Sequence, residues 1–461
     1  MRRKYKCSSF VITMVFMSIL SFLIGCSGGG GGGGNTSTGA ITTPVIFVHG
    51  YAGAADQFET QAMRFATNGY PASYISGYEY DTTLISGNPT AGFVIPAQII
   101  SGLDAYINAV LQQTGANQVD LLGHSMGTAV CQTYLADPTH AAKVAHYVNI
   151  DGQQSATPPG GVPTLALWAA LSGSNASGTG IGGATNITLA ATTHVQAATC
   201  VESFVAIYKF FNNDKAPFIT DILPGSSNNI ELAGRILTFM TNAVPANLKL
   251  DIYEVNKNTG VRIKSTPDYS TLINADGNFT FPHATAGSNY EFYLTSTVDA
   301  TSAHYYYEPF IRSDYLIRLK YLAPSILALL MPESVNYSNL VFIRDKELLG
   351  VNTMYPNEDS LKINGTELCA GVLPGVGLVG TPIALFIFDG SEGVSPELIT
   401  SGPVASLPFI AGLDFFMAAA NPPDSTISIV LNGRFSGKTQ MVNVPNWQST
   451  TDTITVQMWD Y

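Results

Sequence analysis

The residues whose spacing most strongly indicates chemistry are Gly-His-Ser-Met-Gly at positions 123–127. They follow a short apolar run, Val119–Leu122, and precede a stretch with helical spacing, so Ser125 is expected on a sharp strand-to-helix turn. Such a turn holds the serine hydroxyl clear of a sheet. Gly123 and Gly127 are needed beside it because Cβ atoms would collide there. The pattern predicts a nucleophilic serine.

A serine hydroxyl is a weak nucleophile and needs a histidine base that a carboxylate orients. His194 lies in a loop between the strand-like residues 187–190 and a helix predicted from about Thr199. That is the expected place of the base where the chain order is serine, acid, histidine. The weaker candidates follow a helix end, lie inside a strand or fall in a β-rich region: His140, His146, His283 and His304.

The acid can be found by elimination, because the sequence has no Asp or Glu between Gly152 and Thr193. Only Asp137 and Asp151 remain between the serine and the histidine. Asp137 precedes a proline, where turn formation explains it. Asp151 ends the predicted strand 144–150, at the carboxyl edge of a sheet where catalytic groups gather. Asp151 is therefore the predicted acid.

An oxyanion hole is predicted from His49-Gly50-Tyr51, which follows the predicted strand Val45–Val48. A turn of this kind supplies one backbone N–H, and the residue after the nucleophile supplies another. The predicted donors are the main-chain N–H groups of Tyr51 and Met126. His49 is expected to organise the turn with Gly50 and not to act as the base.

The elements that must position these residues change in character along the chain. Residues 44–224 alternate β-rich and helical stretches, which predicts an α/β domain with a mostly parallel sheet. Beyond them, alternation with period two and Asp-Gly or Asn-Thr-Gly turns predicts antiparallel strands, as one or two all-β, sandwich- or barrel-like modules at 225–336 and 337–461. The irregular apolar residues 81–97 fit either a lid or an ordinary long loop.

The N-terminus carries a basic segment and an apolar run, residues 10–24, which is shorter than the roughly 20 residues of a spanning helix. The run ends at Leu-Ile-Gly-Cys26, which resembles the lipobox of bacterial lipoproteins. The resemblance implies that residues 1–25 are a signal peptide and that Cys26 carries a lipid. It places the chain in the cell envelope, in the outer membrane or at the cell surface. Residues 26–43 are Gly-rich and predict a flexible tether.

Composition excludes several classes of function. Hydrophobic residues make up 46% of the 461 residues and charged residues 12%, which excludes a disordered chain. A net charge of -12 argues against binding to nucleic acid. The sequence contains no motif for a metal or a nucleotide, so no metal and no cofactor are expected. Three cysteines remain after the lipobox, Cys131, Cys200 and Cys369, and are expected as buried thiols, although one disulfide is compatible with their number.

Residues 45–53 and 119–127 together resemble the lipase branch of the α/β-hydrolases, in particular the small lipases of Bacillus. The early acid, Asp151, is instead similar to that of archaeal long-chain lipases with a C-terminal β domain, a placement that pancreatic lipases share. The chain departs from the Bacillus type in Gly123 and in lacking an acid in the later loop. The resemblance implies hydrolysis of acylglycerols or other apolar esters through an acyl-enzyme, without a cofactor.

The sequence therefore predicts a serine carboxylic ester hydrolase with Ser125, His194 and Asp151 as its triad. An acyltransferase or a polyester depolymerase would use the same three residues, because sequence does not separate water from another acyl acceptor. A surface protein that binds lipid or polysaccharide and keeps a relict hydrolase domain is the alternative from another class. The intact triad argues against it. Whether the chain has protein partners is unknown from the sequence.

Overall fold

The computed structural model describes most of the chain from Thr43 onward: residues 43–88, 91–175, 178–299, 301–322, 329–350, 359–373, 381–391, 396–434 and 436–460. The predicted signal peptide, Cys26 and all of the predicted tether except Thr43 lie outside these residues. In the part that is described, no helix is both long enough and apolar enough to cross a membrane.

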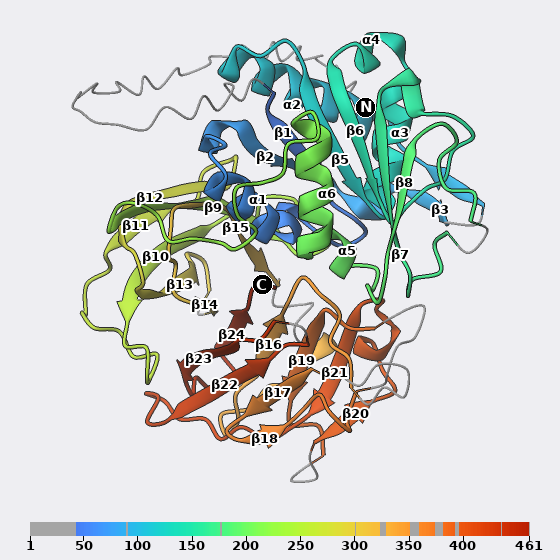
Figure 1. Ribbon diagram of the computed structural model, residues 1–461. Coiled ribbons are helices and arrows are strands. Elements are labelled where there is room, and N and C mark those ends of the chain that lie inside the picture. The colour runs from blue at the N-terminus through green and yellow to red at the C-terminus, as the bar shows by residue number, and fades with distance from the viewer. Residues whose placement is uncertain are drawn as a thin grey trace, which may run out of the picture. The chain divides into compact units, whose positions relative to one another are not determined.

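A six-stranded parallel sheet forms the core of the N-terminal part (Figure 1). Its strand order is β2-β1-β5-β6-β7-β8. The bounds are β1 Val45–Val48, β2 Ile75–Tyr78, β5 Val119–His124, β6 Val144–Ile150, β7 Thr164–Ala169 and β8 Thr185–Leu189. The strands are apolar runs because helices cover both faces of a parallel sheet. The predicted α/β fold with a mostly parallel sheet is confirmed.

Helices pack on the two faces of this sheet in two hydrophobic clusters. Phe47 of β1 belongs to one cluster, and its neighbours Ile46 and Val48 belong to the other, because successive strand side chains point to opposite faces. The first cluster receives α1 (Glu59–Thr67) and α6 (Val201–Phe211), and the second receives α2 (Ala97–Thr114) and α3 (Met126–Leu135). Two further helices have four residues each, α4 (Pro138–Ala141) and α5 (Gln196–Thr199).

The segment 81–97 is more regular than its sequence predicts. It contains a short 3₁₀ helix, Thr82–Leu84, and a hairpin of β3 (Ser86–Asn88) and β4 (Gly92–Val94). Gly87 and Gly92 have φ of 93° and 88°, a left-handed conformation that lets the chain turn back on itself. A role as a lid stays a prediction.

The remaining strands form three sheets. The bounds are β9 Asn229–Thr238, β10 Leu248–Val255, β11 Tyr269–Leu272, β12 Asn278–Thr285, β13 Asn289–Ser296, β14 Ser302–Tyr307, β15 Asp314–Tyr321, β16 Leu340–Ile343, β17 Ser360–Ile363, β18 Thr366–Glu367, β19 Ala384–Phe388, β20 Glu397–Ile399, β21 Ile410–Asp414, β22 Thr426–Asn432, β23 Thr439–Pro445 and β24 Asp452–Gln457. Nine strands form one sheet, in the order β11-β10-β13-β14-β24-β16-β19-β21-β20. A three-stranded sheet, β12-β9-β15, and a four-stranded sheet, β18-β17-β22-β23, lie beside it.

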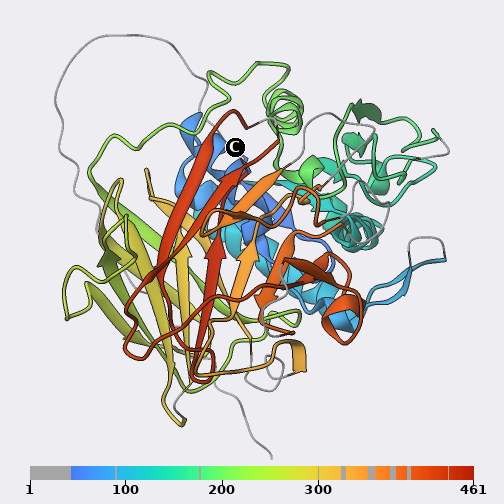
Figure 2. The ribbon, with the colours of Figure 1, turned by 90° about the horizontal axis from the view of Figure 1, so that it is seen from below.

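The nine-stranded sheet runs across the predicted boundary between the two β modules. Strand β14 of the first module pairs in parallel with β24, near the end of the chain, and β24 pairs with β16. Figure 2 shows these yellow, red and orange strands side by side. The predicted division at 336/337 therefore separates sequence segments that share one sheet.

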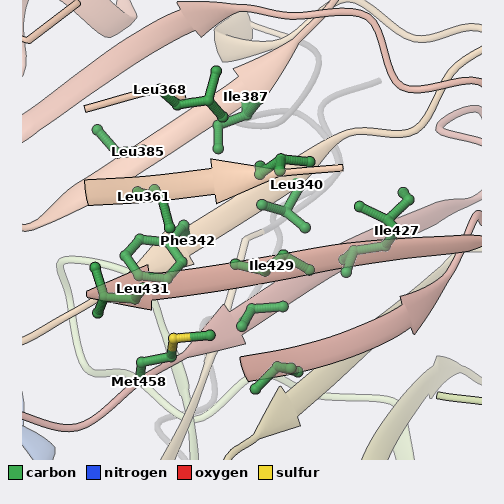
Figure 3. Packing of buried hydrophobic residues seen from close by; sticks show 14 of the residues in the cluster. Leu340, Phe342, Leu361, Leu368, Leu385, Ile387, Ile427, Ile429, Leu431 and Met458 are labelled. Carbon is green, nitrogen blue, oxygen red and sulfur yellow. The ribbon is translucent and has the colours of Figure 1, made fainter. Parts of the chain in front are cut away.

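Each smaller sheet packs on one part of the long sheet. Residues of β9, β12 and β15 share a buried cluster with β10, β13 and β14. Residues of β17 and β22, such as Leu361 and Ile429, share another with β16 and β19, where Phe342 and Leu385 lie (Figure 3). Alternate residues of β22 are buried, as expected where one face of a strand meets the core.

A buried histidine bridges the two halves of the long sheet. His304 of β14 places Nδ1 2.5 Å from Glu291 Oε1 of β13 and Nε2 2.9 Å from Asp452 Oδ1 of β24. Ionised carboxylates only accept hydrogen bonds, so both ring nitrogens must carry a proton. Burial opposes the charge on His304, but hydrogen bonds to Asp452 and Glu291 outweigh it and raise the pKa of His304 above its ordinary value.

This bridge predicts a loss of stability in alkali. A group whose pKa is raised by folding contributes stability below its unfolded pKa, here about 6.5, and loses it as pH rises through the folded pKa. Replacing His304 with Gln removes the charge and should lower the free energy of unfolding by about 3–5 kcal/mol at pH values below the unfolded pKa. Urea unfolding of wild type and His304→Gln, from pH values below the unfolded pKa to alkaline pH, measures the effect. The exposed His283→Gln serves as control, and parallel pH profiles for wild type and His304→Gln would contradict the bridge.

Candidate active site

Ser125 lies on a strained turn between β5 and α3. Its φ and ψ are 52° and -124°, a backbone conformation that costs energy for a residue with a side chain. A Cβ at Gly123 would lie 2.7 Å from the carbonyl oxygen of Gly127, and a Cβ at Gly127 would lie 2.3 Å from that of Val48. Only glycine fits these two positions, so the turn holds its shape by close backbone packing.

The predicted acid and base lie in direct contact. His194 Nδ1 is 2.7 Å from Asp151 Oδ2. Asp151 follows β6 at the carboxyl edge of the sheet and is buried, with 1% of its surface exposed. Its other oxygen, Oδ1, accepts hydrogen bonds from the Ala169 N–H at 2.8 Å and from the Ser174 hydroxyl. The carboxylate is thus fixed from three sides.

The electrostatics of the pair favour a charge on the histidine. Burial opposes ionisation of Asp151, but hydrogen bonds from His194 and Ser174 outweigh it and hold the pKa of Asp151 below its usual range. Burial also opposes a charge on His194, yet the Asp151 carboxylate, and to a smaller extent that of Glu347, raise the pKa of His194. The site therefore stabilises the imidazolium that forms when a base takes the proton of a serine.

The histidine-glycine turn packs directly against the serine. A Cβ at Gly50 would lie 3.1 Å from the Ser125 Cβ, so the two turns are in contact. Within the turn, His49 Nδ1 donates to the Gly50 carbonyl oxygen at 2.8 Å. Burial lowers the pKa of His49 to about 4, which keeps its ring neutral. Tyr51 follows Gly50 and Met126 follows Ser125. The two predicted oxyanion donors are therefore next to the two turns that are in contact.

Two residues that the sequence did not single out connect this turn to the base. Gln57 Oε1 accepts the Gly50 N–H at 3.2 Å, and Gln57 Nε2 donates to His124 Nδ1 at 2.9 Å. His124 Nε2 in turn donates to the main-chain oxygen of His194 at 3.1 Å. Burial lowers the pKa of His124 to about 3, so it acts as a neutral bridge. Neither residue has a motif of its own beyond the position of His124 next to the serine.

Ser125, His194 and Tyr51 line one cavity of about 60 Å³. Its other walls include apolar residues from the β-rich part, and the Phe409 ring lies 6.0 Å from the His194 ring, nearly parallel to it. Pockets for drug-sized ligands measure about 300 Å³ or more, so this cavity is small. A larger cavity of about 280 Å³, beside α1 and β15, contains none of the predicted site residues.

The candidates that the sequence ranked lower lie elsewhere. Asp137 is exposed and accepts the Thr139 N–H at the start of α4. His140 and His146 pair with other aspartates, and His283 is exposed. Cys131, Cys200 and Cys369 are buried free thiols. Among the residues that the structure describes, no group of three or more His, Cys, Asp or Glu side chains could hold a metal ion.

Family models match three parts of the chain. Residues 42–137 match the family model of class 2 lipases, and residues 228–324 match that of the lipase C-terminal domain. The chain is an α/β-hydrolase lipase with a C-terminal domain. Residues 327–461 of the lipase match a further model, which is described as a C-terminal domain. These matches and the fold make the lipase a serine-type ester hydrolase.

Solved structures with some likeness to the lipase include three hydrolases. The lipase BlEst2 of Bacillus licheniformis in its propeptide form is 12% identical, with 88% of this chain and 93% of that chain covered and a TM-score of 0.29. A predicted CIB-like hydrolase from Thermoplasma acidophilum is 17% identical, with 38% of this chain and 89% of that chain covered and a TM-score of 0.28. The phospholipase PlaB from Legionella pneumophila is 12% identical, with 56% of this chain and 86% of that chain covered and a TM-score of 0.28. TM-scores this low carry no weight for the site.

The Asp151–His194 contact predicts the effect of one substitution. Asp151→Asn keeps the shape of the side chain but removes its charge and presents an N–H₂ group that cannot accept from His194 Nδ1. We expect kcat for a p-nitrophenyl ester to fall on the order of 10⁴-fold. The exposed Asp137→Asn, the other acid between serine and histidine, is the matched control and should keep wild-type kcat. Near-normal turnover by Asp151→Asn would show that another group orients the base.

Proposed function

We propose that this lipase hydrolyses acylglycerols or other apolar esters through a Ser125–His194–Asp151 triad. The observation that carries the proposal is the buried Asp151 carboxylate 2.7 Å from His194 Nδ1, because His194 also lines one cavity with the strained Ser125. A nucleophile, a base and a group that orients the base thus converge at one sheet edge. This is the set of roles that acyl transfer requires.

The reaction would proceed in two halves. Ser125 Oγ attacks the ester carbonyl carbon while His194 Nε2 takes the hydroxyl proton, and the carbonyl oxygen becomes an oxyanion between the N–H groups of Tyr51 and Met126. The bond to the alcohol oxygen then breaks, and His194 returns the proton to the departing alcohol. Water, deprotonated by His194, attacks the acyl-enzyme, and the carboxylic acid leaves with Ser125 restored.

The walls of the cavity support an apolar substrate. Beyond the triad they are mostly apolar, with Phe239, Ile343, Ile383, Ala384, Pro408, Phe409 and Ile410 among the lining residues. Burial of an acyl chain against such walls contributes about 0.8 kcal/mol for each methylene group. The cavity of about 60 Å³ is too small for a long chain, so a long acyl chain would have to extend beyond it.

We also propose that the lipase is exported and held in the cell envelope by a lipid on Cys26. Support comes from the lipobox-like Leu-Ile-Gly-Cys26 at the end of the apolar run and from the Gly-rich residues that follow it. An anchor of this kind would keep the catalytic part near apolar esters at the membrane surface while the tether allows it to reorient.

The triad is tested with Ser125→Ala. Loss of the nucleophile should lower kcat by about 10⁴- to 10⁶-fold on p-nitrophenyl esters. The control is Ser101→Ala, on the exposed side of α2. A series of increasing acyl length, with triacylglycerol beside it, measures specificity, and we expect kcat/KM to rise with chain length. Equal rates for wild type and Ser125→Ala would exclude the triad, and a preference for short chains would indicate an esterase.

The anchor is tested by metabolic labelling with palmitate in bacteria. Wild type and Cys7→Ser should incorporate label and sediment with membranes, because Cys7 lies in the predicted signal peptide. Cys26→Ser should do neither. Label retained by Cys26→Ser would rule out lipidation at this residue.

A further inference from the structure

The loop that carries His194 is held by a carboxylate from the far end of the chain. Glu347 Oε1 accepts the N–H of Val195 at 2.6 Å, and its Oε2 accepts the hydroxyl of Thr193 at 2.5 Å and the N–H of Gln196 at 3.1 Å. These three partners are the neighbours of His194 on both sides. Glu347 itself is buried, with 2% of its surface exposed.

Arg434 makes a second contact with the same loop. One of its nitrogens, Nη2, donates to Thr193 Oγ1 and to Gln196 Oε1, each at 3.2 Å. The other, Nη1, donates to the main-chain oxygen of Glu347 and to Asp359. Arg434 thus joins the base loop and the segment of Glu347, and it is buried with 3% of its surface exposed.

The charges behind this contact are balanced. Three acids, Glu347, Asp359 and Asp460, lie with three bases, Arg344, Lys346 and Arg434, and the members are all buried. Asp460 Oδ2 also accepts the hydroxyl of Thr199, at the end of α5, at 2.9 Å. Both ends of the short helix that follows His194 are therefore tied to this cluster. Such a network is costly to rearrange because each opened contact leaves a buried charge unpaired.

The position of the base depends on this support. Asp151 fixes the orientation of the His194 ring, and His124 contacts its main-chain oxygen. Glu347 holds the loop itself, through the Thr193 hydroxyl before His194 and the main-chain N–H groups of Val195 and Gln196 after it. A misplacement of a catalytic group by about 1 Å can cost on the order of 10²-fold in rate. We propose that Glu347, from the C-terminal β region, is a positioning residue that fixes the loop on both sides of the catalytic His194.

The proposal rests on the triad proposed above, and it makes the C-terminal region part of the catalytic machinery. It also assigns Glu347 a charge effect on the base. Among the described residues, the ionisable groups that face His194 or line its cavity are Asp151, His124, Glu347, Tyr51, Lys320 and Asp345. Of these, Asp151 and Glu347 raise the pKa of His194. Loss of the Glu347 charge should lower that pKa.

The test compares Glu347→Gln and Glu347→Asp with wild type. For Glu347→Gln we expect kcat to fall about ten- to 10²-fold with little change in KM, because substrate binding is not touched. The acidic limb of the pH profile of kcat/KM, which follows loss of a proton from His194, should move to lower pH. Glu347→Asp keeps the charge and should keep the limb near its wild-type position, while its shorter side chain still lowers kcat.

The matched control is Glu367→Gln. Glu367 also organises a loop of the C-terminal region, because it accepts the N–H groups of Leu361, Cys369 and Ala370, but these contacts lie within that region. If such carboxylates had a merely structural role, the two Gln variants would lower the melting temperature equally. Neither variant would then shift the acidic limb of its pH profile. The proposal would be overturned if Glu347→Gln had the same kcat as wild type and the same acidic limb in its pH profile of kcat/KM.

A second variant keeps the test decisive if Glu347→Gln does not fold. Thr193→Val removes one donor to Glu347 and one acceptor of Arg434, but it keeps every charged member of the cluster. We expect a fluorophosphonate to label Ser125 several-fold more slowly in this variant than in wild type, and an unchanged rate would overturn the positioning role. A wild-type protein that neither hydrolyses esters nor labels at Ser125 would instead refute the proposed function, and the inference with it.

Discussion

The contact between Asp151 and His194 is the interaction on which the rest of the site depends. A carboxylate with 1% of its surface exposed is tolerated only where hydrogen bonds and an opposite charge offset its loss of water. The parallel sheet supplies the place, because the end of β6 lies between β5, which leads to Ser125, and β7, which presents the Ala169 N–H. The order of the strands therefore determines which groups can meet.

Much of this arrangement follows from local sequence patterns. The strained turn at Ser125, the turn at Gly50 and the strand before Asp151 are each written in fewer than ten residues, and a parallel sheet brings their carboxyl ends to one edge. That geometry explains why residues far apart in sequence could be assigned to one site. It also explains why Asp151 could be found by elimination in a segment that is poor in acids.

Other contacts had no local signal. Glu347 meets Thr193 across 154 positions, and β14 pairs in parallel with β24 across about the same distance in sequence. Parallel strands are not joined by a tight turn, so the sequence carries no local signal of their pairing. The predicted division at 336/337 followed composition and turns, and such patterns do not reveal that one sheet crosses it. The share of the β-rich part in the walls of the Ser125 cavity could not be foreseen for the same reason.

The three histidines near Ser125 show how surroundings select a base. Burial acts on all of them and lowers the pKa of His49 to about 4 and that of His124 to about 3. The ring centre of His124 lies only 4.7 Å from that of His194, so the two rings share one environment of low polarity. What separates them is their partners: His124 meets an amide and a carbonyl oxygen, whereas His194 meets the Asp151 carboxylate. Burial prevails where the hydrogen-bond partners are neutral, whereas the direct Asp151 contact raises the pKa of His194 and so stabilises the proton that Ser125 would give up.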